Sequence, residues 1–364
     1  MNGTEASRRR IGMVAAAAVL LALGVVVSLR MNEEQRETVY RPVRNFSNMC
    51  GYEGKVYCGV NGAYGEPVAV RSSVFTIWDG KVYYVDKVQE AYDSMTDELL
   101  TISRCDLDGG NVETLAEDVF LAGAGHEKLV GDRLFYGYGY DENYRMQYAC
   151  VDVNTKKRTE IASDRIDEIL GYDGNYLYYN GYDTGKEEPI LGRISLQRGK
   201  DETLASYAET DEEGYIDSMS FADGKLYCFT LLHKTDGYDY RTYEYGLQIR
   251  NAENGKVERE VPVRFKGSAN YSFLVSGEEV FVAADGEIIA VPLTETDGSE
   301  SSERKVAALK EAEYWGILHF IPGDGYLYYE AIAEADEETG NNDYFYRVPI
   351  EGGEPELLKE WFTV

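Results

Sequence analysis

The stretch Asp79-Gly80-Lys81-Val82-Tyr83-Tyr84, a tight turn followed by a Tyr-rich strand, returns at regular intervals along the chain. Five further copies of turn glycine and aromatic strand occur at 131–136, 174–179, 224–229, 277–281 and 325–329. From Gly80 to Gly325 the five intervals average 49 residues. A period of this size in a sequence of alternating strands and Asp-Gly turns is typical of a propeller or an array of sheets. The repeat therefore predicts an all-β fold.

Each unit of the repeat divides into four short strands. In the first unit, strands at 74–78 and 81–86 flank the Asp79-Gly80 turn, and strands at 100–106 and 112–115 flank a second turn at 107–110. Four-stranded sheets repeated about an axis leave few exposed edges, so we expect a β-propeller of about six four-stranded blades over residues 46–364. Residues 300–313 alone have a helix-forming composition, and we interpret them as an insertion or as the outer strand of a blade.

A seventh copy of the turn and strand, at 53–58, lies only 26 residues before Gly80, which is too close for a complete blade. Two interpretations remain open. Residues 46–72 form strands that clasp the ring beside the last blade, or they form a truncated seventh blade, which would give the propeller seven blades.

The N-terminus carries three consecutive arginines, at 8–10, followed by the uncharged and mostly apolar run Ile11–Leu29. As a helix this run spans about 28 Å, close to the hydrocarbon thickness of a bilayer. Because arginines favour the cytoplasmic side, we expect a cytoplasmic tail at 1–10, a transmembrane anchor at 11–29, a stalk at 30–45 and an extracytoplasmic propeller at 46–364. The protein would then be a single-pass protein of the cell membrane. A signal peptide cleaved after Val26-Val27-Ser28 is the alternative.

The chain is strongly acidic, with 65 Asp and Glu against 36 Lys and Arg and a net charge of −29. Residues 1–30 contain four Arg and one Glu, so the acidic excess falls on the rest of the chain. A phosphate-binding surface needs Lys and Arg, and nucleic acid is therefore not an expected partner. The acidity favours cations or basic proteins, or it serves solubility alone.

The five cysteines form an odd set, which excludes complete internal pairing. Cys50 and Cys58 flank a turn centred on Gly54, and a three-residue turn there sets them directly opposite each other on a hairpin. Such a pair is compatible with a disulfide. The alternative is that all five cysteines are small buried hydrophobic side chains within strands.

Two stretches of the first unit, Val82–Asp86 and Arg104–Asn111, resemble the YWTD repeat of six-bladed propellers of the low-density-lipoprotein-receptor type. The chain is more similar still to their bacterial extracytoplasmic relatives, a largely uncharacterised family of Gram-positive bacteria. The resemblance covers about residues 46–364 and implies the fold, the compartment and a Gram-positive source. The Trp-Thr of the motif is nowhere intact, Cys228 replaces an aromatic residue, and the copy at 280–282 is weak. This family supplies no catalytic residues to transfer.

Few patterns typical of enzymes occur in the sequence. The three histidines, His126, His233 and His319, form no H-E-x-x-H zinc motif, and neither a G-x-S-x-G elbow nor a Walker loop is present. The run from Asp106 to Glu117 lacks two required residues of a calcium loop. We therefore expect no cofactor, with calcium in the acidic loops at 236–239 and 336–343 as the alternative.

In a propeller the first strand of each blade lies nearest the axis, and the loops leading into these strands form one mouth of the channel. Here these loops carry aromatic and carboxylate side chains, a combination that suits sugars, cations or basic peptides. The candidate ligand-binding residues are Asp167, Tyr215, Asp217, Asn270, Tyr271, Tyr314 and Trp315. The alternative is that the aromatic side chains only pack between blades.

The sequence thus predicts a membrane-anchored extracytoplasmic propeller that binds a protein, peptide or glycan at the cell surface, or serves as a scaffold. One alternative is a carbohydrate-active or other hydrolytic enzyme, because spacing along the chain cannot identify a catalytic carboxylate pair. A second alternative is an accessory subunit of a transporter or envelope complex.

Overall fold

The computed structural model is all-β in the residues that it describes. These are 43–46, 49–52, 55–58, 66–67, 70, 72, 74–86, 99–120, 127–209, 212–234, 243–266, 272–284, 287–293, 303–308, 315–322, 325–336 and 340–362. All of them belong to one compact unit, Tyr40–Val364. The predicted anchor at 11–29 lies outside this set. Within the described residues, no helix has the length and apolar character needed to cross a membrane.

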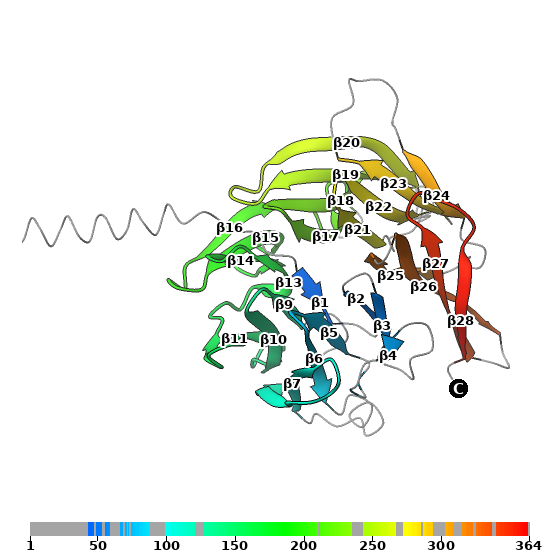
Figure 1. Cartoon of the computed structure of the whole chain (residues 1–364). Helices are drawn as coiled ribbons and strands as arrows, with labels where there is room; N and C mark the ends of the chain where they lie inside the picture. Colours follow the sequence, from blue (N-terminus) through cyan, green and yellow to red (C-terminus); the bar gives the residue numbers. More distant parts are fainter. Residues whose placement is uncertain are drawn as a thin grey trace, which may run out of the picture. The chain divides into compact units, whose positions relative to one another are not determined.

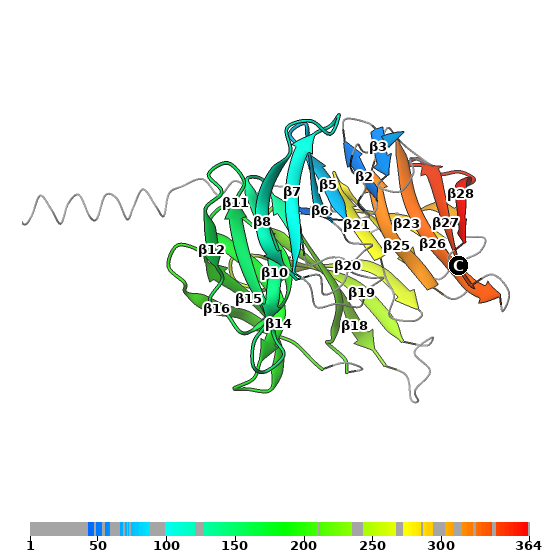
Figure 2. The same ribbon diagram turned by 90° about the horizontal axis from the view of Figure 1, so that it is seen from below.

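Six sheets follow one another in chain order, each with four antiparallel strands in sequential order (Figure 1). Their strands are β5 (Phe75–Trp78), β6 (Lys81–Asp86), β7 (Leu100–Asp106) and β8 (Glu113–Val119); β9 (Lys128–Val130), β10 (Arg133–Tyr140), β11 (Met146–Asp152) and β12 (Arg158–Glu160); β13 (Ile166–Tyr172), β14 (Tyr176–Asp183), β15 (Glu188–Ser195) and β16 (Asp201–Ser206); β17 (Ile216–Ala222), β18 (Lys225–His233), β19 (Glu244–Asn251) and β20 (Val257–Lys266); β21 (Ser272–Ser276), β22 (Glu279–Ala284), β23 (Glu287–Pro292) and β24 (Arg304–Ala308); and β25 (Trp315–Pro322), β26 (Tyr326–Asp336), β27 (Gly340–Pro349) and β28 (Glu356–Phe362). In the last sheet, β25 is the innermost strand and β28 the outermost, as both views show (Figures 1 and 2).

The second strand of a sheet explains the recurring Tyr-Tyr motif. In β6, Val82, Tyr83, Tyr84 and Val85 are all buried, so the strand lacks the apolar–polar alternation of a sheet with one solvated face. Tyr83 and Val85 pack into a core cluster shared with β9, β10 and β11, and Val82 and Tyr84 pack into a second cluster on the other side. Both faces of this sheet are therefore covered by neighbouring sheets, as expected for a blade.

Residues 49–67 form a separate three-stranded sheet of β2 (Met49–Tyr52), β3 (Lys55–Cys58) and β4 (Glu66–Pro67). β2 is a neighbour of both β25 and β5, so this sheet lies between the last and the first four-stranded sheets. The described strands of this segment add no strand to the last sheet.

β1 (Val43–Asn45) lies within the predicted stalk, yet it is a fifth strand on the sheet of β9–β12. It pairs with β9 in the register Val43↔Val130, Arg44↔Leu129 and Asn45↔Lys128. Because β9 is the first strand of its sheet, β1 occupies the inner edge of that sheet. The following residue, Phe46, is buried in the core shared by the first two four-stranded sheets, so the folded unit begins before residue 46.

Candidate functional site

Two of the predicted site residues, Asp167 and Asp217, occupy equivalent places on neighbouring first strands. The register of β13 with β14 shifts at Asp167, and the register of β17 with β18 shifts at Asp217. Each aspartate follows a buried isoleucine, Ile166 or Ile216, and β13 and β17 are neighbours. Each is thus the extra residue of a β-bulge, a device that redirects a side chain and is frequent beside binding and active sites.

The two carboxylates are poorly compensated. Among the described residues, neither accepts a hydrogen bond or forms an ion pair within 4 Å. Burial raises the pKa of Asp217 to about 6, without a contribution from any charged group among the described residues. Burial also raises the pKa of Asp167, against the opposing effect of the Arg145 guanidinium. Asp167 is exposed as a residue, so its desolvation is partial, and the half-buried Asp217 is the better isolated acid.

Tyrosines lie near Asp167. The Tyr148 hydroxyl donates a hydrogen bond to the backbone carbonyl of Asp167, at 2.7 Å. The Tyr207 hydroxyl donates to the side-chain oxygen of Asn180. Burial raises the pKa of Tyr207, and the nearby Tyr215 and Asp167 raise it further, which shows that these side chains share one neighbourhood. We refer to Asp167, Tyr207, Tyr215 and Asp217 as the bulge cluster.

Sequence reasoning missed two charged residues at the start of β9. The ammonium of Lys128, whose side chain is 7% exposed, lies 3.0 Å from a carboxylate oxygen of Glu168 on β13. Glu127 is 0% exposed, and neither of its carboxylate oxygens has a hydrogen-bond partner in the part of the chain that the structure describes. Burial raises the pKa of Glu127 to about 7, although its own N–H and the Lys128 ammonium oppose the shift. The signal for both residues was a charged pair directly before the apolar residues Leu129 and Val130.

The remaining predicted site residues are only partly placed. Asn270, Tyr271 and Tyr314 lie outside the described residues. Trp315 is the first residue of β25, where a register shift follows directly after it, but its side chain lies outside the described set. Tyr215 is half-buried and precedes β17 directly.

The predicted cysteine pair does not have the expected geometry. The hairpin of β2 and β3 is present, but it pairs Met49 with Cys58 and Cys50 with Tyr57. The register therefore differs by one residue from the one in which the cysteines are opposite each other, and a shift of one residue turns a side chain to the other face. Cys50 is buried and forms no disulfide, and its sulfur lies 3.8 Å from the Thr76 hydroxyl oxygen. The turn is one residue shorter than the three-residue turn that the sequence suggested.

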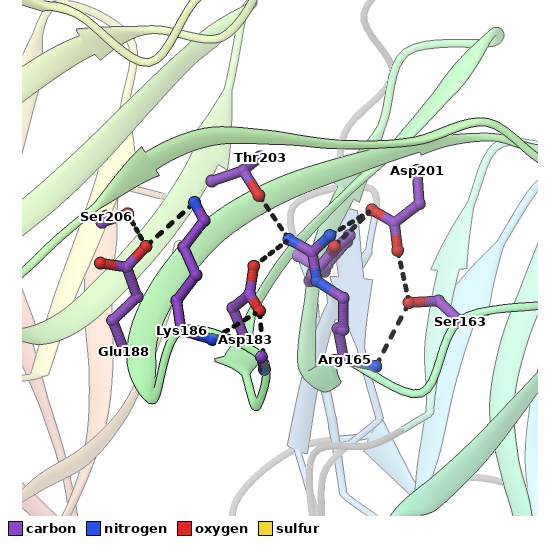
Figure 3. Close-up of polar contacts among 10 residues, drawn as sticks. Ser163, Arg165, Asp183, Lys186, Glu188, Asp201, Thr203 and Ser206 are labelled. Carbon is purple, nitrogen blue, oxygen red and sulfur yellow. Dashed lines mark hydrogen bonds and ion pairs between the residues drawn. The ribbon is translucent and has the colours of Figure 1, made fainter.

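A second polar network lies on the sheet of β13–β16 (Figure 3). The Arg165 guanidinium donates to the hydroxyl of Thr203 at 2.5 Å and lies 4.0 Å from Asp183 and 3.9 Å from Asp201. The Ser163 hydroxyl donates to Asp201 at 2.7 Å. Unlike the bulge cluster, each carboxylate here has a donor, so this network ties the segment before β13 to β16. We assign it a structural role.

Candidate metal ligands are not grouped in the described residues: no set of three His, Cys, Asp or Glu side chains there is placed to hold an ion. The acidic loop at 236–239 lies outside the described set, and so do residues 337–339 of the second loop at 336–343, whose other residues belong to β26 and β27. The calcium alternative for these loops is untested. The chemistry available to the bulge cluster is therefore that of carboxylates and phenols, which bind positively charged groups by hydrogen bonds, charge and ring faces.

No protein-family model and no curated protein matches the chain. Its fold is similar to a structure from a study of two prolyl endopeptidases, at 12% identity and a TM-score of 0.52 over 79% of this chain and 42% of that one. The propeller domain of the Trilobed protease from Pyrococcus furiosus is similar at 12% identity and a TM-score of 0.46, over 77% and 82% of the two chains. TolB from Acinetobacter baumannii follows at 12% and 0.41, over 76% and 65%.

The chain thus spans less than half the length of the prolyl endopeptidase. At such identities the similarity shows the fold alone, and that fold is a β-propeller.

Proposed function

We propose that the protein is a membrane-anchored extracytoplasmic binding module whose bulge cluster takes a positively charged group of a protein or peptide partner. The observation that carries this proposal is the equivalent placement of Asp167 and Asp217 at β-bulges of neighbouring first strands. A four-stranded antiparallel sheet does not require a bulge at this position. Two neighbouring first strands that each place an aspartate at such a bulge indicate that both aspartates have a function.

The energetics of Asp217 support a cationic ligand. A carboxylate that is partly removed from water without a partner destabilises the protein, and a donor from a ligand offsets that cost. With a pKa of about 6, Asp217 is mainly ionised at neutral pH and carries the charge that an ammonium or guanidinium group would neutralise. The exposed Asp167 on the next strand supplies a second acceptor.

The surroundings suit the same ligand. Tyr207 lies near Tyr215 and the Asp167 carboxylate, and aromatic rings bind cations. The net charge of −29 attracts basic partners over a longer range and speeds their association. A glycan is the alternative ligand, because sugars also stack on tyrosine rings.

The proposal includes a specific architecture. The six four-stranded sheets and the sheet of β2–β4 would together make seven blades, of which the sheet of β2–β4 is incomplete. Residues 11–29 would anchor the protein as a single-pass protein of the cell membrane, with Arg8-Arg9-Arg10 in the cytoplasm and the propeller outside. The length and apolar composition of that run support this orientation.

The test is a binding measurement on the full chain in nanodiscs, with Lys- and Arg-rich peptides, neutral and acidic peptides of equal length, and neutral glycans. We expect the basic peptides to bind, and Asp217→Asn and Asp167→Asn each to weaken binding by about tenfold, because each removes a charged hydrogen bond. The control is Glu253→Gln, which removes an exposed acid at the turn between β19 and β20.

An equal loss in the control would assign the binding to overall charge and would contradict the proposal. Glycan binding that survives both aspartate substitutions would favour the glycan alternative. Cleavage of a peptide or glycan that depends on these aspartates would favour a hydrolytic enzyme. Absence of peptide and glycan binding, with co-purification of another membrane protein, would favour the accessory subunit.

A further inference from the structure

β1 is held on the inner edge of its sheet by few interactions. Its pairing with β9 extends over three residues, from Val43 to Asn45. Directly after it, the backbone N–H of Phe46 donates a hydrogen bond of 3.3 Å to the backbone carbonyl of Glu127. Short edge segments of this kind open locally at a lower free-energy cost than the whole fold. Separation of β1 from β9 therefore breaks few backbone hydrogen bonds, and it also moves the adjacent Phe46, which lies in the core.

Next to this pairing lies Glu127, a buried acid without a described side-chain hydrogen-bond partner. Its side chain is 0% exposed and neither carboxylate oxygen has a described hydrogen-bond partner. Lys128, the adjacent cation, directs its ammonium to Glu168 instead. The guanidinium of Arg44 on β1 lies over the Trp78 ring, 4.5 Å from its centroid.

Other titratable groups lie in the same region. Tyr148 on β11 is in electrostatic contact with Glu127 and, from β13, with Asp167 and Glu168. The described charged group that acts on Glu127 itself is the Lys128 ammonium, which opposes the effect of burial. Ionised Glu127 would still lack a described hydrogen-bond partner while buried, which is costly, and it gains water most cheaply if the short strand beside it separates.

We propose that β1 is a detachable strap whose attachment to β9 depends on a protonated Glu127, so that ionisation of Glu127 releases the strap. The strap leads directly to residues 1–42, which contain the predicted membrane anchor. At its other end, Asn45 pairs with Lys128, whose ammonium bonds Glu168 beside the bulge cluster. Protonation of one side chain would thus connect the N-terminal segment with the candidate site. The inference does not depend on any ligand.

The test is amide hydrogen exchange of the full chain in nanodiscs at pH 6 and pH 8, expressed as protection relative to the intrinsic exchange rate. With the pKa of Glu127 near 7 in the closed state and 4.5 in the open state, protection at residues 43–46 should fall about tenfold between these pH values. In Glu127→Gln the fall should be absent. Protection at 177–179, in the middle of β14, should not change in either protein.

The matched control is His126→Asn, because a histidine titrates in the same pH range. It should behave as the wild type does. Equal pH dependence in the wild type and Glu127→Gln, or its disappearance in His126→Asn, would overturn the proposal. If Glu127→Gln does not fold, the wild-type profile decides: a fall confined to residues 43–46 supports the strap, and unchanged or uniformly lowered protection contradicts it.

Discussion

The ammonium of Lys128 lies 3.0 Å from the carboxylate of Glu168, and this ion pair joins the first strands of two neighbouring sheets. The Lys128 side chain is 7% exposed, whereas the Glu168 side chain is 45% exposed. The two partners therefore differ in what they lose when the pair is broken. The carboxylate regains water, but the ammonium stays buried.

This asymmetry predicts that Glu168→Gln destabilises the protein more than the double variant Lys128→Met/Glu168→Gln. We expect the single substitution to lower the free energy of unfolding by about 1–3 kcal/mol, because it leaves a buried cation with a neutral partner. Removing the cation as well should recover most of this loss. Urea denaturation of the two single variants and the double variant gives the coupling energy. Additive effects would contradict the pairing.

A second prediction concerns Asp217, whose pKa of about 6 in the folded protein lies above its ordinary value of 3.8. Between these values the folded state retains a proton that the unfolded state has lost, so its contribution to stability falls as the pH rises from about 4 to about 6 and stays low above. Asp217→Asn removes this loss. Urea denaturation at pH 7 should therefore give this variant a free energy of unfolding about 1–2 kcal/mol higher than that of the wild type. Near pH 3 the two free energies of unfolding should be equal.

The same substitution should weaken binding of basic peptides, so stability and binding change in opposite directions. Asp201→Asn serves as the contrast, because Asp201 accepts hydrogen bonds from Ser163 and Tyr179 and should lose stability when neutralised. An Asp217→Asn protein that is less stable than the wild type at pH 7 would show that its carboxylate has a partner.

The cysteines yield a third prediction. Cys50, Cys105, Cys150 and Cys228 are buried thiols that form no disulfide, and burial raises the pKa of each, to about 12 for Cys150 and Cys228. A thiol with a raised pKa forms little thiolate and reacts slowly. In Cys58→Ser, we expect a thiol reagent to label no cysteine of the native protein and four after denaturation.

The wild type, denatured without reductant, should yield a fifth reactive thiol. Three thiols would instead reveal a disulfide between Cys50 and Cys58, in conflict with the observed register.

A fourth prediction concerns Gly181 on β14, where the chain approaches another backbone segment closely. A Cβ added at Gly181 would lie 1.7 Å from the carbonyl oxygen of Arg165. Gly181→Ala should therefore destabilise the protein by about 3 kcal/mol, since a backbone atom cannot move aside as a side chain can. Gly185→Ala is the control: its nearest neighbour is a side-chain oxygen of Asp183 at 3.4 Å. We expect the control to change stability by less than about 0.5 kcal/mol. Similar melting temperatures for the two variants would contradict the contact.

Much of the strand pattern could be predicted because it depends on neighbouring residues. The first unit was expected at 74–78 and 81–86 and is found in β5 and β6, since Asp79 and Gly80 both adopt the positive φ of a hairpin turn. Residues 300–313 have a helix-forming composition, yet 304–308 form the outer strand β24, because pairing with β23 outweighs the intrinsic preference. The three residues of β1 are too few to produce a periodic signal.

The sequence by itself determined that this protein is built from repeated Tyr-rich sheets, because a tight turn and the strand beside it are specified by residues that are close together in the chain. It also supplied Asp167, Tyr215 and Asp217 as candidates. Only the tertiary structure decided that the two aspartates share a bulge position, that Cys50 faces away from the expected partner, and that Glu127 is buried without one. Each of these properties depends on the register or packing of strands against one another, and a shift of one residue reverses the face on which a side chain lies.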